Sequence, residues 1–326
     1  MYLLIIPKLI LALLFCRETF AGCTGSVLRG RRCTCPHEYT FSLHIKLDTG
    51  ITIFYELGQE YRLGFGGTSN IYHAYVPNRN PNNHGRCVAL KVALTTAANM
   101  ELKIHEYFYQ LRTEHLQQLP NPHPLQQIEQ LEQIQPYFLN HIINYYGFKH
   151  KRSIDRTFIA LELGGKTLST FYNENRNNSN HEQLLITLLK GAAKALAQFS
   201  QYGFHFDIKE SNFVVFDNFE IKLIDFHLSI LFNDQDPHNI ICSNVDAFHR
   251  APELRQEESI PFFGRLAARY QKVDVWAFGI MAFLMRTNIE IPHIFDPTNI
   301  DYTSLDQQIY HYKSSPDNHP LDRIIK

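Results

Sequence analysis

The chain has 326 residues, 44% of them hydrophobic and 13% aromatic, so it can bury a sizeable core in one large domain or in two lobes. Its 31 Lys and Arg residues nearly balance 32 Asp and Glu residues, and a formal net charge of -1 argues against nucleic acid or anionic lipid as a partner. The 17 His residues show no His-Glu-x-x-His spacing and the Cys residues no paired Cys-x-x-Cys spacing, which argues against a dedicated zinc site.

The N-terminal segment is almost wholly apolar from Tyr2 to Phe15 and continues into small residues around Ala21. This pattern is typical of a secretory signal peptide, so we expect cleavage after residues 1–21 and a location in the secretory lumen or outside the cell. The segment contains Pro7 and is too short for a stable membrane span. A buried strand or an incorrectly chosen start codon is the alternative, with a cytoplasmic location.

Residues 22–50 form a Cys-containing segment. Five Cys residues remain after cleavage, at most two internal disulfides can form, and one thiol is left over. Pairing of Cys23 with Cys33 or Cys35 would close a small loop, as suits an oxidising compartment. In that pathway the triplet Asn177-Asn178-Ser179 is an acceptor for N-glycosylation.

The region from Phe41 to Tyr61 has the alternating apolar residues of one or two strands. It leads into a glycine-rich hairpin at residues 63–72. Gly64, Gly66 and Gly67 allow backbone amides to approach a polyphosphate without interference from a Cβ. A tight hairpin with no ligand is the alternative.

A strand at Val88-Ala89-Leu90-Lys91 and a helix follow this hairpin. The helix offers Glu101 as a partner for Lys91, with Glu106 as the alternative. We prefer Glu101 because residues such as Leu102 and Phe108 then form the apolar faces that a packed helix requires.

Residues 114–135 are rich in Gln and Pro and carry an apolar residue at every third position from Leu125 to Ile134. We expect an insertion with one amphipathic helix on the surface of a lobe, and a partner-docking helix is the alternative. Strand-like runs follow at residues 141–147 and 157–165. A long amphipathic helix then begins near Glu182 and ends at Gly203.

The stretch from His205 to Asn212 reads His-Phe-Asp-Ile-Lys-Glu-Ser-Asn, and Asp225 follows Asp207 by eighteen residues. The residues between them alternate as one short hairpin does. Asp207 and Asp225 therefore return to the same edge of a cleft.

These motifs, with Ala-Pro-Glu at 251–253 and Asp-Val-Trp at 274–276, occur in the order typical of eukaryotic protein kinases, and the chain resembles that superfamily from Leu63 to Gly279. The resemblance implies a bilobal α+β fold. It has a small, mainly antiparallel β lobe with one helix at residues 51–164 and a larger, mainly α-helical lobe at residues 165–326. The chain stops about where the family's last helices should begin, so we expect a C-terminally truncated large lobe.

The resemblance also implies ATP and Mg²⁺ as cofactors. Lys91, held by Glu101, pairs with the α- and β-phosphates, and Asp207 orients the acceptor hydroxyl and takes its proton. Lys209 lies near the transferred phosphate, as in Ser/Thr-directed members. The metal ligands are Asn212 and Asp225.

The nucleotide site implied by the resemblance includes residues of the glycine-rich hairpin, of the strand with Lys91, and of the hinge between the lobes. Leu161 guards the adenine pocket, and Glu162 and Leu163 present backbone groups to the adenine edge. The predicted nucleotide contacts are Leu63, Gly64, Gly66, Gly67, Ile71, Ala89, Lys91, Glu162 and Leu163.

Three positions of the large lobe depart from the family pattern. Phe206 replaces the Arg that receives an activation-loop phosphate, so we predict no phosphorylation switch at Ser243. His227 stands where the family has Gly, and Asp246 stands where a Thr normally bonds the catalytic Asp, which places a like charge near Asp207. Glu253 is expected to lack its Arg partner.

The sequence thus predicts an ATP- and Mg²⁺-dependent Ser/Thr kinase that acts on a protein substrate and neither binds nucleic acid nor spans a membrane. A catalytically inactive kinase-like binding or scaffold module is the main alternative, and a small-molecule kinase with the same fold is a third. The sequence indicates no particular oligomeric state.

Overall fold

The computed structural model describes residues 41–67, 69–77, 85–114, 139–216, 219–234, 240–241, 245–246, 248–255, 259–260, 272–287, 302–316 and 321–322. The expected signal peptide, the Cys residues at 23, 33, 35 and 242, and the Gln- and Pro-rich insertion beyond Glu114 lie outside these ranges. Within the described ranges, every helix is too short or too polar to traverse a lipid bilayer.

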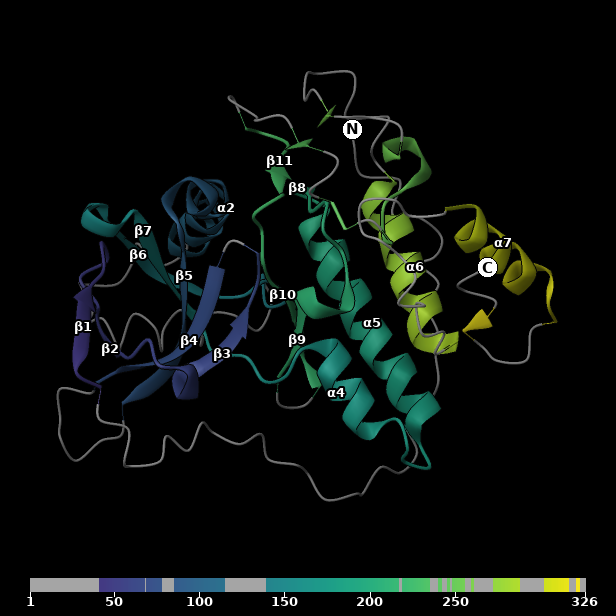
Figure 1. Ribbon diagram of the computed structural model, residues 1–326, viewed down its shortest axis with the longest axis horizontal. Helices are drawn as coiled ribbons and strands as arrows, with labels where there is room; N and C mark the ends of the chain where they lie inside the picture. The colour runs from purple at the N-terminus through teal and green to yellow at the C-terminus, as the bar shows by residue number, and fades with distance from the viewer. Residues whose placement is uncertain are drawn as a thin grey trace.

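The small lobe is a seven-stranded antiparallel sheet in the order β1-β2-β4-β5-β7-β6, with β3 paired to β4. Figure 1 shows this sheet at one end of the molecule with helix α2 beside it. The elements are β1 (Leu43–Lys46), β2 (Thr52–Tyr55), β3 (Arg62–Phe65), β4 (Ser69–Val76), β5 (Arg86–Leu94), α2 (Thr95–Glu114), β6 (Tyr145–Lys151) and β7 (Arg156–Glu162).

The alternation of side chains along β5 divides the small lobe into two faces. Val88 and Leu90 are fully buried in a cluster within the small lobe. Ala89 and Ala93 belong to the cluster that continues into the large lobe. Lys91 shares the parity of these two alanines, and its side chain therefore points toward α2 and the large lobe.

Helix α2 is attached to the chain after it by Arg112, which is buried. Its guanidinium donates hydrogen bonds to the carbonyl oxygens of Leu139 at 3.0 Å, Ile142 at 2.8 Å and Ile143 at 3.4 Å. Burial lowers the pKa of Arg112 to about 10, and Glu162 and Tyr146 oppose that shift.

We expect Arg112→Ala to lower the free energy of unfolding by about 3 kcal/mol, because three buried carbonyl groups lose a charged donor. Urea unfolding followed by circular dichroism measures this loss. Arg152→Ala is the matched control, since Arg152 is exposed and should change stability by about 0.5 kcal/mol or less. Equal effects of the two variants would contradict the anchoring role of Arg112.

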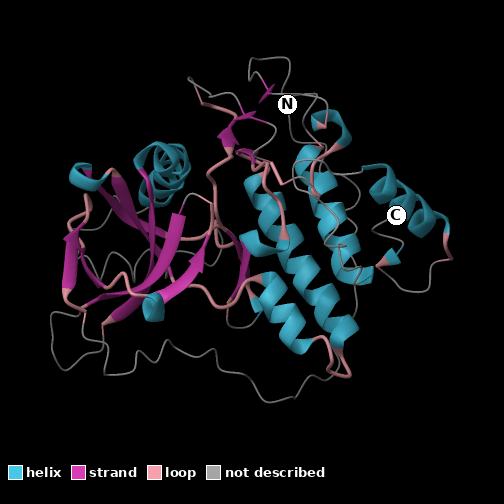
Figure 2. Ribbon diagram, viewed as in Figure 1, coloured by secondary structure: helices cyan, strands magenta, loops and turns pink. Residues whose placement is uncertain are grey.

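The large lobe is mainly helical, with α5 and α6 side by side in its core (Figure 2). Leu188, Leu189 and Ala192 form part of the buried stripe of α5. The helices are α4 (Leu168–Asn175), α5 (His181–Phe199), α6 (Val273–Thr287) and α7 (Tyr302–Ser314). Three two-stranded antiparallel sheets complete the lobe: β8 (Gly203–Phe204) pairs with β11 (Ile230–Leu231), β9 (Phe213–Val215) with β10 (Ile221–Leu223), and β12 (Ile240–Ile241) with β13 (Ser259–Ile260).

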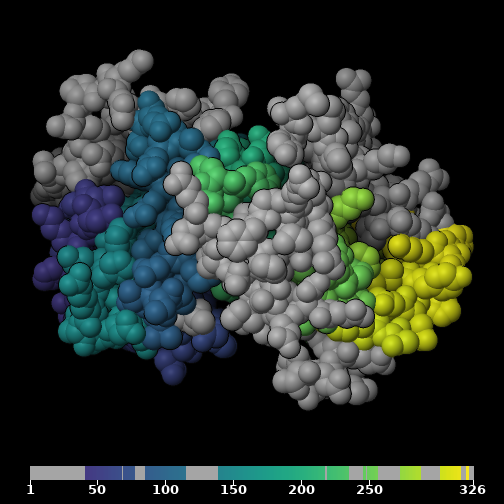
Figure 3. Space-filling model, turned by 90° about the horizontal axis from the view of Figure 1, so that it is seen from above, coloured from purple at the N-terminus to yellow at the C-terminus, as the bar shows by residue number. Residues whose placement is uncertain are grey.

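Seen from above, the small lobe lies at one end and α7, in yellow, at the other (Figure 3). This arrangement is the bilobal α+β fold that the sequence predicts. The predicted strands on either side of the glycine-rich tip are confirmed as β3 and β4, and the predicted hairpin between Asp207 and Asp225 is confirmed as β9 and β10.

Two predicted boundaries are wrong. The long helix ends at Phe199 instead of Gly203, and Gly203 begins β8. A Cβ at Gly203 would lie 2.2 Å from the carbonyl oxygen of Ile230, so this glycine is required by close strand pairing and not by a helix end. The run predicted as a strand from 141 begins at Tyr145, because Ile143 donates its N–H to Leu223 of the large lobe instead.

Candidate active site

Lys91 lies at the centre of a buried charge cluster between the lobes. Its Nζ is 2.6 Å from Glu101 Oε2 of α2 and 2.8 Å from Asp225 Oδ1, which follows β10. The side chains of Lys91 and Glu101 are 6% and 2% exposed, so this pair is shielded from water. The structure contains the predicted Lys91–Glu101 pair, and Glu106, the alternative partner, forms no ion pair within the described residues.

The charges of this cluster stabilise one another. Burial alone would lower the pKa of Lys91, but Asp225 and then Glu101 outweigh it and raise that pKa. Burial would likewise raise the pKa values of both carboxyl groups, yet Lys91 holds the pKa of Glu101 below its usual range and that of Asp225 well below it. His105 adds to this effect on Glu101 from 3.3 Å away.

The catalytic-loop residues predicted from the sequence also converge. Asn212 Nδ2 donates to the carboxylate of Asp207 and to its backbone oxygen, both at 2.7 Å. Lys209 Nζ lies 2.9 Å from the same carboxylate, and burial, which would lower the pKa of Lys209, is outweighed by Asp207. The side chain of Asp207 is 2% exposed. A carboxylate in this position is held by two donors and cannot rotate freely.

Asp274 of α6 holds the backbone at the start of the catalytic loop. The two carboxylate oxygens of Asp274 accept the N–H groups of His205 at 2.7 Å and Phe206 at 2.8 Å. Phe206 has a φ of 62°, which is uncommon for a residue with a side chain and needs support from its surroundings. Burial raises the pKa of Asp274 to about 6, although the two N–H groups oppose that shift.

His205 supports the loop from inside. Its Nδ1 accepts the N–H of Asp207 at 3.3 Å, so its Nε2 carries the proton and donates to the carbonyl oxygen of Ile224 at 3.1 Å. The neutral ring thus joins the segment with Asp207 to the segment with Asp225. Burial lowers the pKa of His205 to about 4, against the opposing charge of Asp207.

This buried histidine predicts a pH dependence of stability. The unfolded chain binds a proton at His205 below pH 6.5, whereas the folded chain resists protonation down to about pH 4. Stability should therefore fall as the pH falls through this window, by about 2 kcal/mol between pH 7 and pH 4.5 from this group. Chemical unfolding of the wild type and His205→Gln at both pH values isolates the contribution. Parallel losses in the two proteins would contradict it.

Asp225 is positioned by the residue that follows it. Phe226 is fully buried and stacks on Phe199 of α5 with ring centroids 5.2 Å apart. This anchor holds Asp225 at a φ of 63° and turns its carboxylate toward Lys91. His227 comes next, and its Nδ1 lies 2.9 Å from Asp225 Oδ1. Burial would lower the pKa of His227, but the contact with Asp225 outweighs it and raises that pKa.

The predicted nucleotide contacts are spread over β3, the turn after it, β4, β5 and the end of β7. Ile71 is paired with Lys91 across β4 and β5, and Ala89 is paired with Leu161 of β7, whereas Leu63 is exposed. A Cβ built on Gly64 or Gly67 would meet no atom within 4 Å. Protein packing therefore does not require these glycines, which is consistent with space kept for a ligand.

At the predicted hinge, one backbone group already has a partner. The N–H of Glu162 donates to the carbonyl oxygen of Asn144 at 2.8 Å, so that N–H is not available to an adenine edge. The side chain of Glu162 forms a buried ion pair with Lys222 of β10 at 2.8 Å. The hinge is thereby tied to the large lobe behind the site.

The residues present fit a metal-bound nucleotide. Among the described residues nothing bonds the side-chain oxygen of Asn212 or the second carboxylate oxygen of Asp225, and both are hard oxygen donors of the kind Mg²⁺ prefers. Oxygen atoms of Asp207 and Asp225 also lie within 4.8 Å of each other. Asn212 and Asp225 would hold the ion, and Lys91 would meet the phosphates.

The departures from the family pattern have local explanations. Asp246 pairs with His249 at 2.9 Å, and although burial opposes the shift, His249 and then Lys209 lower the pKa of Asp246 to about 2. The predicted like charge near Asp207 is therefore compensated. Within the described residues Glu253 forms no ion pair.

A different contact holds this part of the chain to the large lobe. Arg255 pairs with Asp306 of α7 at 2.8 Å, and its guanidinium lies 4.2 Å from the centre of the Tyr302 ring. The residues that follow Glu253 thus attach to α7 through a charge and an aromatic ring.

The contacts of several residues of the site were not predicted from the sequence. The contacts of Asp274, His205 and Lys222 depend on segments that are far apart along the chain. For Asp274 the available signal was its place in Asp-Val-Trp, which indicated a buried anchor but not the two N–H groups that it holds.

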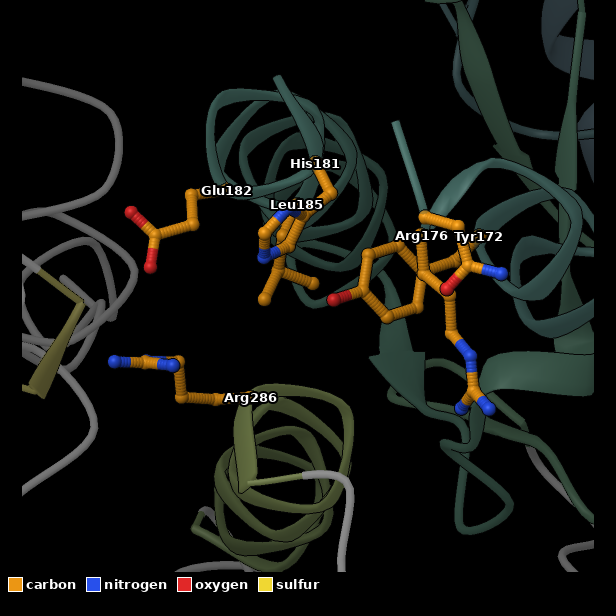
Figure 4. Close-up of a pocket in the computed structure, with 7 residues that line it drawn as sticks. Tyr172, Arg176, His181, Glu182, Leu185 and Arg286 are labelled. Carbon is orange, nitrogen blue, oxygen red and sulfur yellow. The ribbon is translucent and has the colours of Figure 1, made fainter. Parts of the chain in front are cut away.

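A separate cavity of about 280 Å³ lies in the large lobe between α4, α5 and α6, where Tyr172, Glu182 and Arg286 point toward it (Figure 4). None of the predicted site residues lines this cavity.

Comparison with known proteins defines the class. A family model described as protein kinase domain matches residues 59–324, and the chain belongs to the protein kinase family. It is 24% identical over 230 residues, 69% of its length, to a probable receptor-like protein kinase of Arabidopsis thaliana, of which the match covers 24%.

Two further relatives are similar over shorter regions. The serine/threonine-protein kinase dst2 of Dictyostelium discoideum is 28% identical over 143 residues, which are 43% of this chain and 12% of that protein. Protein kinase kin1 of Schizosaccharomyces pombe is 28% identical over 122 residues, 37% of this chain and 12% of that protein. The chain therefore spans at most about a quarter of the length of these relatives.

Proposed function

We propose that the protein transfers the γ-phosphate of ATP to serine or threonine hydroxyls of a protein substrate, with Mg²⁺. The observation that carries this proposal is the placement of Lys91 between Glu101 and Asp225, at 2.6 and 2.8 Å. That arrangement aligns the small lobe with the metal-binding segment of the large lobe, which phosphoryl transfer in this family requires.

Each residue has one task in this mechanism. Lys91 neutralises phosphate charge, and Glu101 keeps it in place. The Asp207 carboxylate accepts a hydrogen bond from the substrate hydroxyl, orients its oxygen for attack and takes its proton. Lys209, 2.9 Å from Asp207, then faces the developing negative charge. Asn212 and Asp225 would hold Mg²⁺, which would supply charge neutralisation at the phosphates.

The test is transfer of radiolabelled phosphate from ATP to generic protein substrates, followed by phosphoamino-acid analysis. We expect phosphoserine or phosphothreonine with the wild type and a loss of about 1000-fold or more with Asp207→Asn, which removes the base. Lys103→Ala, on the exposed face of α2, is the matched control and should retain activity. Transfer by wild type and Asp207→Asn alike, or by neither, would defeat the enzyme assignment.

The second candidate is an inactive kinase-like binding module. One observation favours it: Asp225 Oδ1 is shared by Lys91 and His227, at 2.8 and 2.9 Å, so the metal ligand of the family is already doubly engaged. An inactive module predicts no transfer under any metal, with or without nucleotide binding. The retention of all six polar groups of the mechanism supports the enzyme over this alternative.

For location we propose the secretory lumen or the exterior, based on the N-terminal pattern. The acceptor Asn177 is exposed in the turn between α4 and α5, so it is accessible for glycosylation there. N-terminal sequencing of secreted protein is expected to begin after Ala21. A retained Met1 on the mature protein would contradict a signal peptide.

A further inference from the structure

His227 places a nitrogen donor beside Asp225, the predicted metal ligand. Its ring lies beside the two acidic side chains, and the donor atoms of Asp207, Asp225 and His227 all lie within 4.8 Å of one another. The side chain of His227 is 29% exposed and that of Asp225 is 31% exposed, so an ion can reach both from solvent. Among the described residues no other set of three such side chains is close enough to hold an ion.

The geometry suits coordination. Two ligand atoms that lie about 2.1 Å from an ion, at right angles to each other, are about 3 Å apart. The Nδ1 of His227 and the Oδ1 of Asp225 are 2.9 Å apart. An ion can therefore bridge this edge with little movement when it takes the place of the Nδ1 proton, and Asp207 lies beside it and remains available as the base.

The neighbouring cations do not block such an ion. Asp225 Oδ1 also accepts from Lys91, and the Asp207 oxygens accept from Lys209 and Asn212. Each carboxylate oxygen has two lone pairs, and the second oxygen of Asp225 receives no hydrogen bond within the described residues. The backbone that carries His227 is fixed because Phe226 before it is fully buried.

Imidazole nitrogen is the feature that discriminates between metals. Mg²⁺ is a hard ion that takes oxygen ligands and retains water, whereas divalent transition metals accept imidazole together with carboxylate. We propose that Asp225 and His227 supply an oxygen and a nitrogen ligand to the divalent metal ion of this site, and that the site therefore binds a transition metal ion in preference to Mg²⁺. The inference rests on the proposed function, because it assigns the metal of the same site.

The test uses Mn²⁺ alone, without nucleotide or substrate. Pulsed electron paramagnetic resonance of Mn²⁺ bound to the wild type is expected to show coupling to one imidazole nitrogen, and calorimetry is expected to show tighter binding of Mn²⁺ than of Mg²⁺. In His227→Gly the nitrogen coupling should vanish and the affinity for Mn²⁺ should fall at least about tenfold, with Mg²⁺ affinity unchanged. His181→Ala, far from the site at the start of α5, is the matched control.

The spectrum of the wild type is decisive even if His227→Gly fails to fold. Absence of nitrogen coupling, or equal affinity for Mn²⁺ and Mg²⁺, would overturn the proposal and leave His227 as a hydrogen-bond partner of Asp225 only. Nitrogen coupling in a protein that transfers no phosphate would defeat the proposed kinase activity but support the metal site. Phosphate transfer with Mg²⁺ and no nitrogen coupling would support the kinase activity and defeat the metal site.

Discussion

Replacement of Lys91 by Ala is expected to reduce phosphate transfer by at least about 100-fold and to lower the free energy of unfolding by about 3 to 5 kcal/mol. The activity falls because no other described cation lies within ion-pair distance of both Glu101 and Asp225. Stability falls because Glu101, only 2% exposed, is left as a buried charge with His105 as its remaining partner. Transfer assays and urea unfolding measure the two effects. Lys103 lies on α2, the helix of Glu101, and its side chain is 48% exposed. Lys103→Ala should therefore leave phosphate transfer and the free energy of unfolding nearly unchanged.

A double-mutant cycle separates the charge effect from general damage. In Lys91→Met with Glu101→Gln, neither side chain of the pair is charged, so the double variant should be more stable than the sum of the two single losses predicts. The double variant should nevertheless be as inactive as the single variants. Additive losses of stability would show that the buried pair is not energetically coupled.

Replacement of Asp274 by Ala has the largest expected effect on stability alone. It leaves the N–H groups of His205 and Phe206 buried without acceptors, and each unsatisfied group costs about 1 to 3 kcal/mol. The left-handed backbone of Phe206, at a φ of 62°, also loses its support. We expect a loss of about 4 kcal/mol in the free energy of unfolding.

Two variants calibrate this loss. Asp274→Asn keeps one side-chain oxygen as an acceptor and is expected to lose less stability than Asp274→Ala. Asp306→Ala removes an acidic side chain that is 50% exposed and should cost about 1 kcal/mol or less. Thermal or urea unfolding of the three variants provides the comparison. A cost for Asp274→Ala as small as that for Asp306→Ala would contradict the role of Asp274 in holding the loop.

The elements set by local pattern were predictable from the sequence. The glycine-rich hairpin, the strand with Lys91 and the hairpin before Asp225 follow from turn residues and alternating apolar positions, and the structure contains all three. The pairing of Lys91 with Glu101 was predictable because the faces of α2 define which carboxylate is turned inward.

Contacts between distant segments were not predictable in the same way. The end of α5 was misplaced because Gly203 was taken as a helix end, whereas it is required by the carbonyl oxygen of Ile230. The use of the Glu162 N–H by Asn144 likewise depends on how the hinge meets the preceding chain. His227 was recognised as a departure from the family pattern, but its contact with Asp225 follows from side-chain geometry that spacing does not encode.

We propose that Lys91, Asn212 and Asp225 together hold a metal-bound nucleotide. The most direct measurement is calorimetric binding of ATP to the wild type and to Asp225→Asn, each with and without saturating Mg²⁺. We predict that ATP binds the wild type, that Mg²⁺ strengthens this binding, and that the Mg²⁺ effect disappears in Asp225→Asn. Absence of ATP binding to the wild type, or an equal Mg²⁺ effect in both proteins, would contradict a metal-bound nucleotide at this site.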